Sequence, residues 1–322
     1  MRPALVDWMA RFMSRDLALI LAPTWFTFVG LAGVITLLLM LRAARRAGVD
    51  RAVIAGAILW GYLAAVVAGI VVPMAIDLIE QTLRTGRPRL HWAGMTSFWG
   101  YLAGGVAVTL VARAHRIAPA RLGDLAAAPL GVALACARLG CFVAGCDYGK
   151  VSSAPWAVRF PTGSPAWRDH VHAGLVPAGR GASLPVHPTQ LYEAGLGLVI
   201  AALAIVVART AWARARHGRV VVVAVVAYAI GRLGIEELRG DVGRGFFGPL
   251  SSGQVFALLL LTALAATWAW RRRRAATATA AALVAAALVV AAPGAVRAGP
   301  GADDGTGAGL PTPTTPAPTG WR

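Results

Sequence analysis

The sequence predicts an all-α polytopic membrane protein with about seven transmembrane helices, a candidate eighth, and loops on the outer side of the membrane. Of its 322 residues, 57% are hydrophobic and 14% are charged, and the mean hydropathy is +0.64, which is too apolar for an ordinary soluble domain. Several runs reach the roughly 20 residues that cross the hydrocarbon core. Only helices and closed barrels satisfy their backbone in lipid, and barrel strands are much shorter than these runs.

Seven apolar runs are predicted to span the membrane. They cover residues 17–41, 52–76, 97–112, 125–145, 189–207, 220–238 and 251–270. The first is too long for the core of a signal peptide, so we expect it to be a retained span. A further run rich in alanine and valine, 275–292, is the possible eighth helix.

The chain divides into one membrane domain and a tail. Residues 1–274 form the transmembrane domain, 275–298 carry the possible extra helix, and 299–322 are rich in proline, threonine and glycine. That last composition is typical of disordered segments. The longest stretches outside the spans, 77–95 and 147–188, are expected on the outer side.

The net charge of +17 first suggests nucleic acid, but the placement of the charge argues against it. Arginines cluster in alternate short loops, at Arg42, Arg45, Arg46 and Arg51, at Arg113, Arg116 and Arg121, at Arg209, Arg214, Arg216 and Arg219, and at residues 271–274. This is the positive-inside pattern of membrane proteins. It places these loops in the cytoplasm and the N-terminus outside, and predicts a membrane partner and no nucleic acid.

The three cysteines, Cys136, Cys141 and Cys146, are spaced five apart. They form no C-x-x-C pair and have no paired histidines nearby, so we expect no metal site. Cys136 is interpreted as a small core residue. Cys146, at the membrane edge, is either inertly buried, reactive or disulfide-bonded.

The sixth predicted span carries three charged residues on one helical face. Arg232 and Glu236 are four residues apart, and Arg239 follows three further on. One interpretation is a structural ion pair between Arg232 and Glu236 that makes both charges tolerable in lipid. The other is that Glu236 orients Arg232, whose guanidinium then binds a phosphate through two nitrogens.

A polar string, HPTQLYE (residues 187–193), opens the fifth predicted span. Its proline suits the first helical turn. Gln190 and Glu193 lie one turn apart, with Tyr192 beside them and His187 just before the helix. A polar helix entrance is a common structural feature, but the same residues are also candidates for substrate binding.

Arg138 lies about two turns before Gly145 and Cys146 in the fourth predicted span, and it has no acidic neighbour within a turn of its own helix. A charged side chain in the membrane costs roughly 2.5–3.5 kcal/mol on insertion scales and usually faces a polar cavity or a ligand. The partner of Arg138 must therefore come from another span or from a ligand. Together with Arg232, it predicts one anion site at membrane depth.

Four motifs in order resemble the prolipoprotein diacylglyceryl transferase family. They are ARLGCFVAGCDYG (137–149), HPTQLYE (187–193), YAIGRLGIEELR (228–239) and SSGQ (251–254). The resemblance implies a multi-pass enzyme of the bacterial inner membrane with its site near the outer leaflet and no cofactor. Such an enzyme moves the diacylglyceryl group of phosphatidylglycerol onto the lipobox cysteine of a prolipoprotein signal peptide and releases glycerol phosphate. The resemblance also implies that Arg138 and Arg232 hold the lipid headgroup, supported by Glu236 and Arg239.

The sequence departs from the family pattern at several polar positions. Cys141 and Ala144 replace two asparagines, Cys146 replaces a glutamate, and Trp99 replaces a histidine in the third span. Cys141, Gly145, Cys146 and Trp99 remain candidates for substrate binding.

A thiol needs a base or a lowered pKa to attack at neutral pH. Asp147, His187 and His91 are the possible substitutes for the lost polar groups. Asp147 is the first choice, because partial burial would raise its pKa toward a useful range.

The predicted function is therefore transfer of a diacylglyceryl group from phosphatidylglycerol to a prolipoprotein thiol. Two alternatives stay open. One is a divergent relative that transfers a lipid-derived group to another acceptor. The other is a membrane protein that binds anionic lipids without chemistry.

Overall fold

The computed structural model describes the chain except residues 16, 18–23, 88–96, 180, 243 and 292–322. Its helices are α1 (Arg2–Met9), α3 (Trp25–Arg46), α4 (Arg51–Thr85), α5 (Ser97–Ala114), α6 (Pro119–Ala144), α7 (Pro165–His172), α8 (Thr189–Ala208), α9 (Ala211–Arg214), α10 (Arg219–Glu236) and α11 (Ser252–Ala291). A short antiparallel hairpin joins β1 (Phe246–Phe247) to β2 (Leu250–Ser251). The chain separates into two compact units, 1–267 and 268–322.

Each of the seven predicted spans coincides with a helix of at least 18 residues: α3, α4, α5, α6, α8, α10 and α11. Five of them, α3, α4, α6, α8 and the first part of α11, are long and apolar enough to cross a bilayer. Of the other two, α10 carries Arg232 and Glu236 within its length. The predicted fold class is confirmed.

The three largest differences from the predicted boundaries lie in the first, second and last spans. The start of the first predicted span falls partly outside the described residues, and its helix begins at Trp25. The second span continues as helix to Thr85, because residues 77–85 contain no glycine or proline to break it, and the helix ends at Gly86, which has a left-handed backbone (φ 67°). The last span runs on through residues 271–274 to Ala291 without a break, since arginine and alanine both favour helix. The possible eighth helix is thus a continuation of the seventh.

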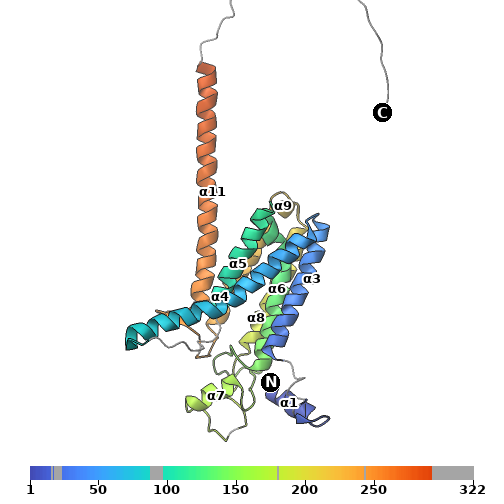
Figure 1. The fold of residues 1–322 in the computed structure, drawn as a ribbon, viewed down its shortest axis with the longest axis vertical. Helices are drawn as coiled ribbons and strands as arrows, with labels where there is room; N and C mark the ends of the chain where they lie inside the picture. Colours follow the sequence, from blue (N-terminus) through green and yellow to red (C-terminus); the bar gives the residue numbers. More distant parts are fainter. Residues whose placement is uncertain (16, 18–23, 88–96, 180, 243, 292–322) are drawn as a thin grey trace, which may run out of the picture. The chain divides into compact units, whose positions relative to one another are not determined.

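In the first unit, α6 packs against α3, α8 and α10, and α4 packs along α5 (Figure 1). The α6–α8 crossing is close because glycines face each other there. A Cβ atom on Gly131 would lie 2.6 Å from the carbonyl oxygen of Gly197, and the reverse distance is the same. Small residues that let backbones touch are the usual packing device of membrane helices. This crossing fixes the positions of Arg138 and Glu193, one on each helix.

The loop between α6 and α8 has a small core of its own. Tyr148, Phe160, Ala166 and Val186 are buried together. Backbone bridges pair Val158 with Val186 and Pro161 with Ala182, so the proline-rich loop is folded. In Figure 1, α7 of this loop and α9, within the arginine-rich loop after α8, lie at opposite ends of the helix bundle.

Candidate active site

Three chain segments meet where α6, α8 and α10 approach the folded loop. The amide of Gly149 donates to the carbonyl oxygen of His187 (3.0 Å), that of Lys150 to Leu238 (2.7 Å), and that of Gly240 to Tyr148 (3.0 Å). A Cβ atom on Gly149 would lie only 2.5 Å from the His187 carbonyl oxygen. Glycine is therefore required at this junction, which brings three of the four sequence motifs together.

The string that opens α8 anchors the end of α6. Thr189 Oγ1 donates to the carbonyl oxygen of Asp147 (2.7 Å), and Gln190 Nε2 donates to that of Cys146 (2.6 Å). Both side chains are fully buried. The turn itself uses left-handed backbone at Gly145 (φ 82°) and Asp147 (φ 53°), and aspartate is one of the few residues that tolerate this conformation. Thr189 and Gln190 thus hold Asp147 in place.

Glu193 lies between the two intramembrane arginines. Its Oε2 is 2.7 Å from Nε of Arg138, and its Oε1 is 2.5 Å from Nη1 of Arg232. The Glu193 side chain is only 1% exposed. Arg138 and Arg232 thus lie on either side of one carboxylate, and the partner of Arg138 comes from another helix.

Glu236 connects the same network to the end of α10. Its Oε2 is 2.7 Å from Nη2 of Arg232, so the predicted pair within α10 is present. Its Oε1 is 3.7 Å from Nη1 of Arg244. Gly253, from the SSGQ motif, packs directly on this pair: a Cβ atom there would lie 2.6 Å from both Arg232 Nη2 and Glu236 Oε2.

Asp147 links the remaining arginines. Its Oδ2 is 3.1 Å from Nη1 of Arg138, and its Oδ1 is 2.6 Å from Nη2 of Arg239. Arg239 also pairs with Asp241 at 2.7 Å. Among the described residues, four arginines (138, 232, 239, 244) and four carboxylates (147, 193, 236, 241) therefore form one continuous network of balanced charge.

This arrangement bears on the two interpretations of Arg232. One was a structural ion pair with Glu236, and the other was that Glu236 alone orients Arg232 and leaves its guanidinium to bind a phosphate. Its two terminal nitrogens instead bind Glu193 and Glu236, because α8 supplies a second carboxylate that the spacing within α10 cannot reveal. Arg138 is the more accessible arginine, with 17% of its side chain exposed against 7% for Arg232.

The expectation for Asp147 was wrong in sign. Burial by itself would raise the pKa of Asp147, but the guanidinium groups of Arg138 and Arg239 outweigh it and hold the pKa below its ordinary value. A carboxylate held ionised by two arginines is a poor proton acceptor at neutral pH. Asp147 is thus suited to orienting arginines and not to general-base catalysis.

His187 and Tyr192 form a separate polar pair at the entrance of α8. His187 Nδ1 is 3.1 Å from the Tyr192 hydroxyl, which also accepts a hydrogen bond from Trp156 Nε1 (2.7 Å). Trp99 is half-buried on α5. His91, the third possible base, lies outside the described residues.

Sequence reasoning missed three members of the site. Asp241 and Arg244 follow the third motif, and neither was given a role, although an acid two residues after Arg239 was a signal for an ion pair. Gly253 was noted only as part of a motif. Glycine is needed at this position for a steric reason, which only the packing of α11 against α10 reveals.

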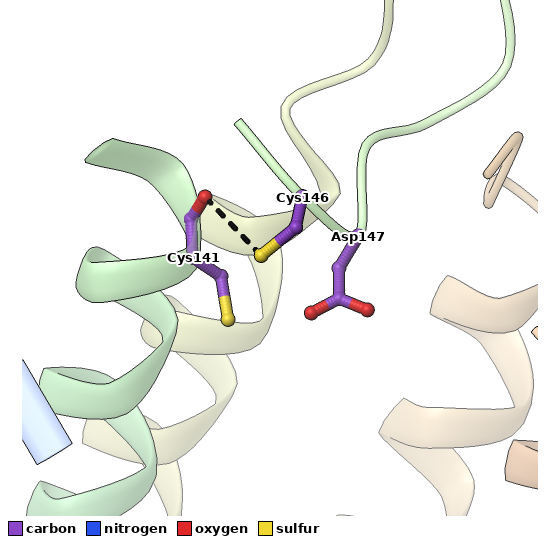
Figure 2. A group of neighbouring side chains, drawn as sticks. All are labelled: Cys141, Cys146 and Asp147. Atoms are coloured by element: carbon purple, nitrogen blue, oxygen red, sulfur yellow. Dashed lines mark hydrogen bonds between the residues drawn. The ribbon is translucent and has the colours of Figure 1, made fainter. Parts of the chain in front are cut away.

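The sequence was expected to hold no metal site, yet two thiols and a carboxylate come together after α6. The sulfur atoms of Cys141 and Cys146 and a carboxylate oxygen of Asp147 all lie within 4.8 Å of one another (Figure 2). Thiolates and a carboxylate are possible ligands of zinc. However, each Asp147 oxygen already pairs with an arginine, and two adjacent guanidinium groups oppose a divalent cation.

Comparison with known proteins identifies the family of this chain. Residues 17–270 match the family described as prolipoprotein diacylglyceryl transferase, which is most of the chain. The chain belongs to this family.

Similar proteins carry the name phosphatidylglycerol–prolipoprotein diacylglyceryl transferase. One from Caulobacter vibrioides is 37% identical over 183 residues, covering 55% of this chain and 58% of the relative. One from Brucella ovis is 33% identical over 186 residues (56% and 60%), and one from Clostridium tetani is 30% identical over 168 residues (52% and 60%). The matched part of this chain thus spans about three-fifths of each relative's length.

Replacing Asp147 by asparagine is expected to remove a pH-dependent part of the free energy of unfolding. The folded-state pKa lies below the unfolded value of about 3.9. The stabilisation is therefore present above the unfolded pKa and is lost as the pH falls through the folded one. Unfolding by sodium dodecyl sulfate, measured from about pH 7 to about pH 3 in mixed micelles, should show a smaller acid loss for Asp147→Asn than for the wild type.

Asp7→Asn is the matched control, because Asp7 forms an exposed pair with Arg15 at 3.5 Å. It should follow the wild-type profile. If Asp147→Asn also follows that profile, Asp147 is not held by Arg138 and Arg239 as described.

Proposed function

We propose that this chain transfers the diacylglyceryl group of phosphatidylglycerol to the lipobox cysteine of a prolipoprotein. The cysteine sulfur attacks the glyceryl carbon that bears the phosphate ester. A carbon–sulfur bond forms, the carbon–oxygen bond breaks, and glycerol phosphate leaves with the electron pair. The observation that carries the proposal is the placement of Arg138 and Arg232 on either side of Glu193, where helices that span the lipid meet the folded loop.

The arginines suit a leaving phosphate. Charge grows on the phosphate oxygens as the carbon–oxygen bond breaks, and donors fixed in advance stabilise it most. Arg138 uses Nε and Nη1 for Glu193 and Asp147, and we assign its Nη2 to a phosphate oxygen. Arg232, Glu236 and Arg239 hold this arrangement rigid.

An apolar groove between α5 and α11 suits the acyl chains. Its volume is about 600 Å³, and its lining includes Leu102, Val106 and Leu110 of α5, and Phe256, Leu259 and Leu260 of α11. Tyr101 and Arg113 also line it, three turns apart on α5. Lipid tails are as apolar as these side chains, so the groove can admit them from the bilayer.

We assign proton removal from the thiol to His187. Histidine is the commonest general base in enzymes. His187 belongs to the same backbone junction as Asp147, and its Nδ1 is engaged by Tyr192, which leaves Nε2 for the thiol. A His187→Gln variant that transfers at the wild-type rate would exclude this role.

The function is tested with the full chain in phospholipid nanodiscs that contain phosphatidylglycerol. A peptide with a lipobox cysteine should gain one diacylglyceryl group by mass spectrometry, with one glycerol phosphate released per peptide. A cysteine-to-serine peptide and nanodiscs of phosphatidylethanolamine serve as controls and should give no product. Phosphatidylglycerol binding without any product would contradict the proposal and favour a lipid-binding protein without chemistry.

The proposed site requires the folded loop after α6 to face outward. In a cysteine-free background, Ser153→Cys should react with a membrane-impermeant maleimide in intact spheroplasts, and Arg214→Cys should react only after lysis. Both positions are exposed and lie on the two loops at opposite ends of the bundle. Labelling of Arg214→Cys alone in intact cells would reverse the orientation, and with it the outer-leaflet site.

A further inference from the structure

The end of α6 brings two of the three cysteines together. The amides of Gly145 and Cys146 both donate to the carbonyl oxygen of Cys141, at 2.8 and 3.2 Å. This closure, with left-handed backbone at Gly145, is the common way a helix ends on glycine. The turn at Gly145, the C-cap of α6, folds Cys146 back against the last helical turn. Cys146 therefore lies next to Cys141.

The two sulfur atoms are positioned to react with each other. They lie within 4.8 Å of one another, and Cys146 Sγ contacts the carbonyl oxygen of Cys141 at 3.8 Å. In Figure 2 both sulfurs lie on the same side of the turn. The hydrogen bond from the amide of Cys146 to the carbonyl oxygen of Cys141 holds the two backbone segments against each other, and a disulfide requires two cysteine backbones that lie close together. Bringing the two sulfur atoms to bonding distance requires rotation of the side chains.

The two thiols differ in access. Cys141 is buried, with 5% exposure, whereas Cys146 is partly exposed. An external disulfide can therefore reach Cys146 first, and Cys141 is the thiol that resolves the product. The compartment outside the inner membrane is oxidising, which is where the proposed orientation places this turn.

We infer that Cys141 and Cys146 form a reversible dithiol–disulfide couple beside the arginine network. The Cys146 thiolate attacks an external disulfide, one thiol leaves, and the Cys141 thiolate then displaces the second thiol. The two cysteines lose two electrons and two protons, and the external disulfide is reduced to two thiols. The inference does not rest on the transferase activity.

The couple lies next to the site in space and in sequence. Arg138 Nη1 is 4.0 Å from Cys141 Sγ, and Asp147, which follows Cys146, pairs with both Arg138 and Arg239. Closing the disulfide fixes the turn that carries Asp147. Oxidation is therefore expected to raise the unfolding temperature, and a reductant should reverse the change.

The test counts thiols in the full chain in nanodiscs. The protein is equilibrated in glutathione buffers from about −300 to about −150 mV. It is then denatured and alkylated with N-ethylmaleimide, and its intact mass is measured. The wild type should pass from three alkylated cysteines to one as the buffer becomes oxidising. Cys136→Ser should pass from two to none, whereas Cys141→Ser and Cys146→Ser should form no internal disulfide.

Two results would overturn the inference. One is three alkylated cysteines in the most oxidising buffer. The other is one zinc ion per chain in native mass spectra that is absent from Cys141→Ser and protects both thiols from alkylation. That result would make this turn a metal site. The thiol count uses no peptide substrate. A failed transfer assay therefore does not contradict the disulfide, and a missing disulfide does not contradict the transferase activity.

Discussion

Replacing Glu193 by glutamine is expected to destabilise the helix bundle by about 3–5 kcal/mol, the usual cost of removing one partner from a buried ion pair. Glu193 is 1% exposed and is shared by Arg138 and Arg232, so its loss leaves two buried guanidinium groups facing each other. Glutamine keeps the shape but supplies no charge, and its amide group can accept from only one of them. The free energy of unfolding by sodium dodecyl sulfate in mixed micelles measures the effect.

Glu80→Gln is the matched control for this substitution. Glu80 pairs with Arg84 at 2.5 Å, but the two side chains are 56% and 75% exposed. Exposed pairs contribute only about 0.2–1 kcal/mol, so the control should change little. If Glu193→Gln costs no more than Glu80→Gln, the two intramembrane arginines do not depend on Glu193.

Replacing Arg138 by lysine is expected to lower the rate of diacylglyceryl transfer by about 10²–10³-fold, the loss typical when one donor to a developing oxyanion is removed. Arg138 binds Glu193 through Nε and Asp147 through Nη1, and the proposed function assigns a third nitrogen to the phosphate. A lysine ammonium is a point charge without this fixed planar geometry. The nanodisc assay should show the loss mainly in kcat, because the contact strengthens as the phosphate leaves.

Arg159→Lys provides the control on the same loop as the proposed outer site. Arg159 donates to the carbonyl oxygen of Ser183 at 3.2 Å, which a lysine can also do, so transfer should remain close to the wild-type rate. Normal transfer by Arg138→Lys would remove Arg138 from the headgroup site. A loss accompanied by unfolding would instead be visible in the detergent titration used for Glu193.

The sequence predicted the spans well because the signal is local. A run of about 20 apolar residues is long enough to cross the membrane whatever its neighbours do, and each of the seven runs contains a long helix within its described residues. The ion pair between Arg232 and Glu236 was also predicted from the sequence, because residues four apart share a helical face. The continuation of α11 through residues 271–274 was missed, since the change from apolar to charged residues marks a membrane boundary without breaking a helix.

The sequence by itself predicted that Arg138 needs a partner from another span or from a ligand, because an isolated charge is too costly in lipid. Only the tertiary structure decided that Glu193 is this partner, since the α6–α8 crossing sets which residues meet. The same holds for Asp147. Its arginine partners lie 9 and 92 residues away, and their charges reverse the pKa shift that burial alone predicts. Electrostatic environment depends on distances between segments, and those distances are fixed by helix packing, which spacing along the chain does not encode.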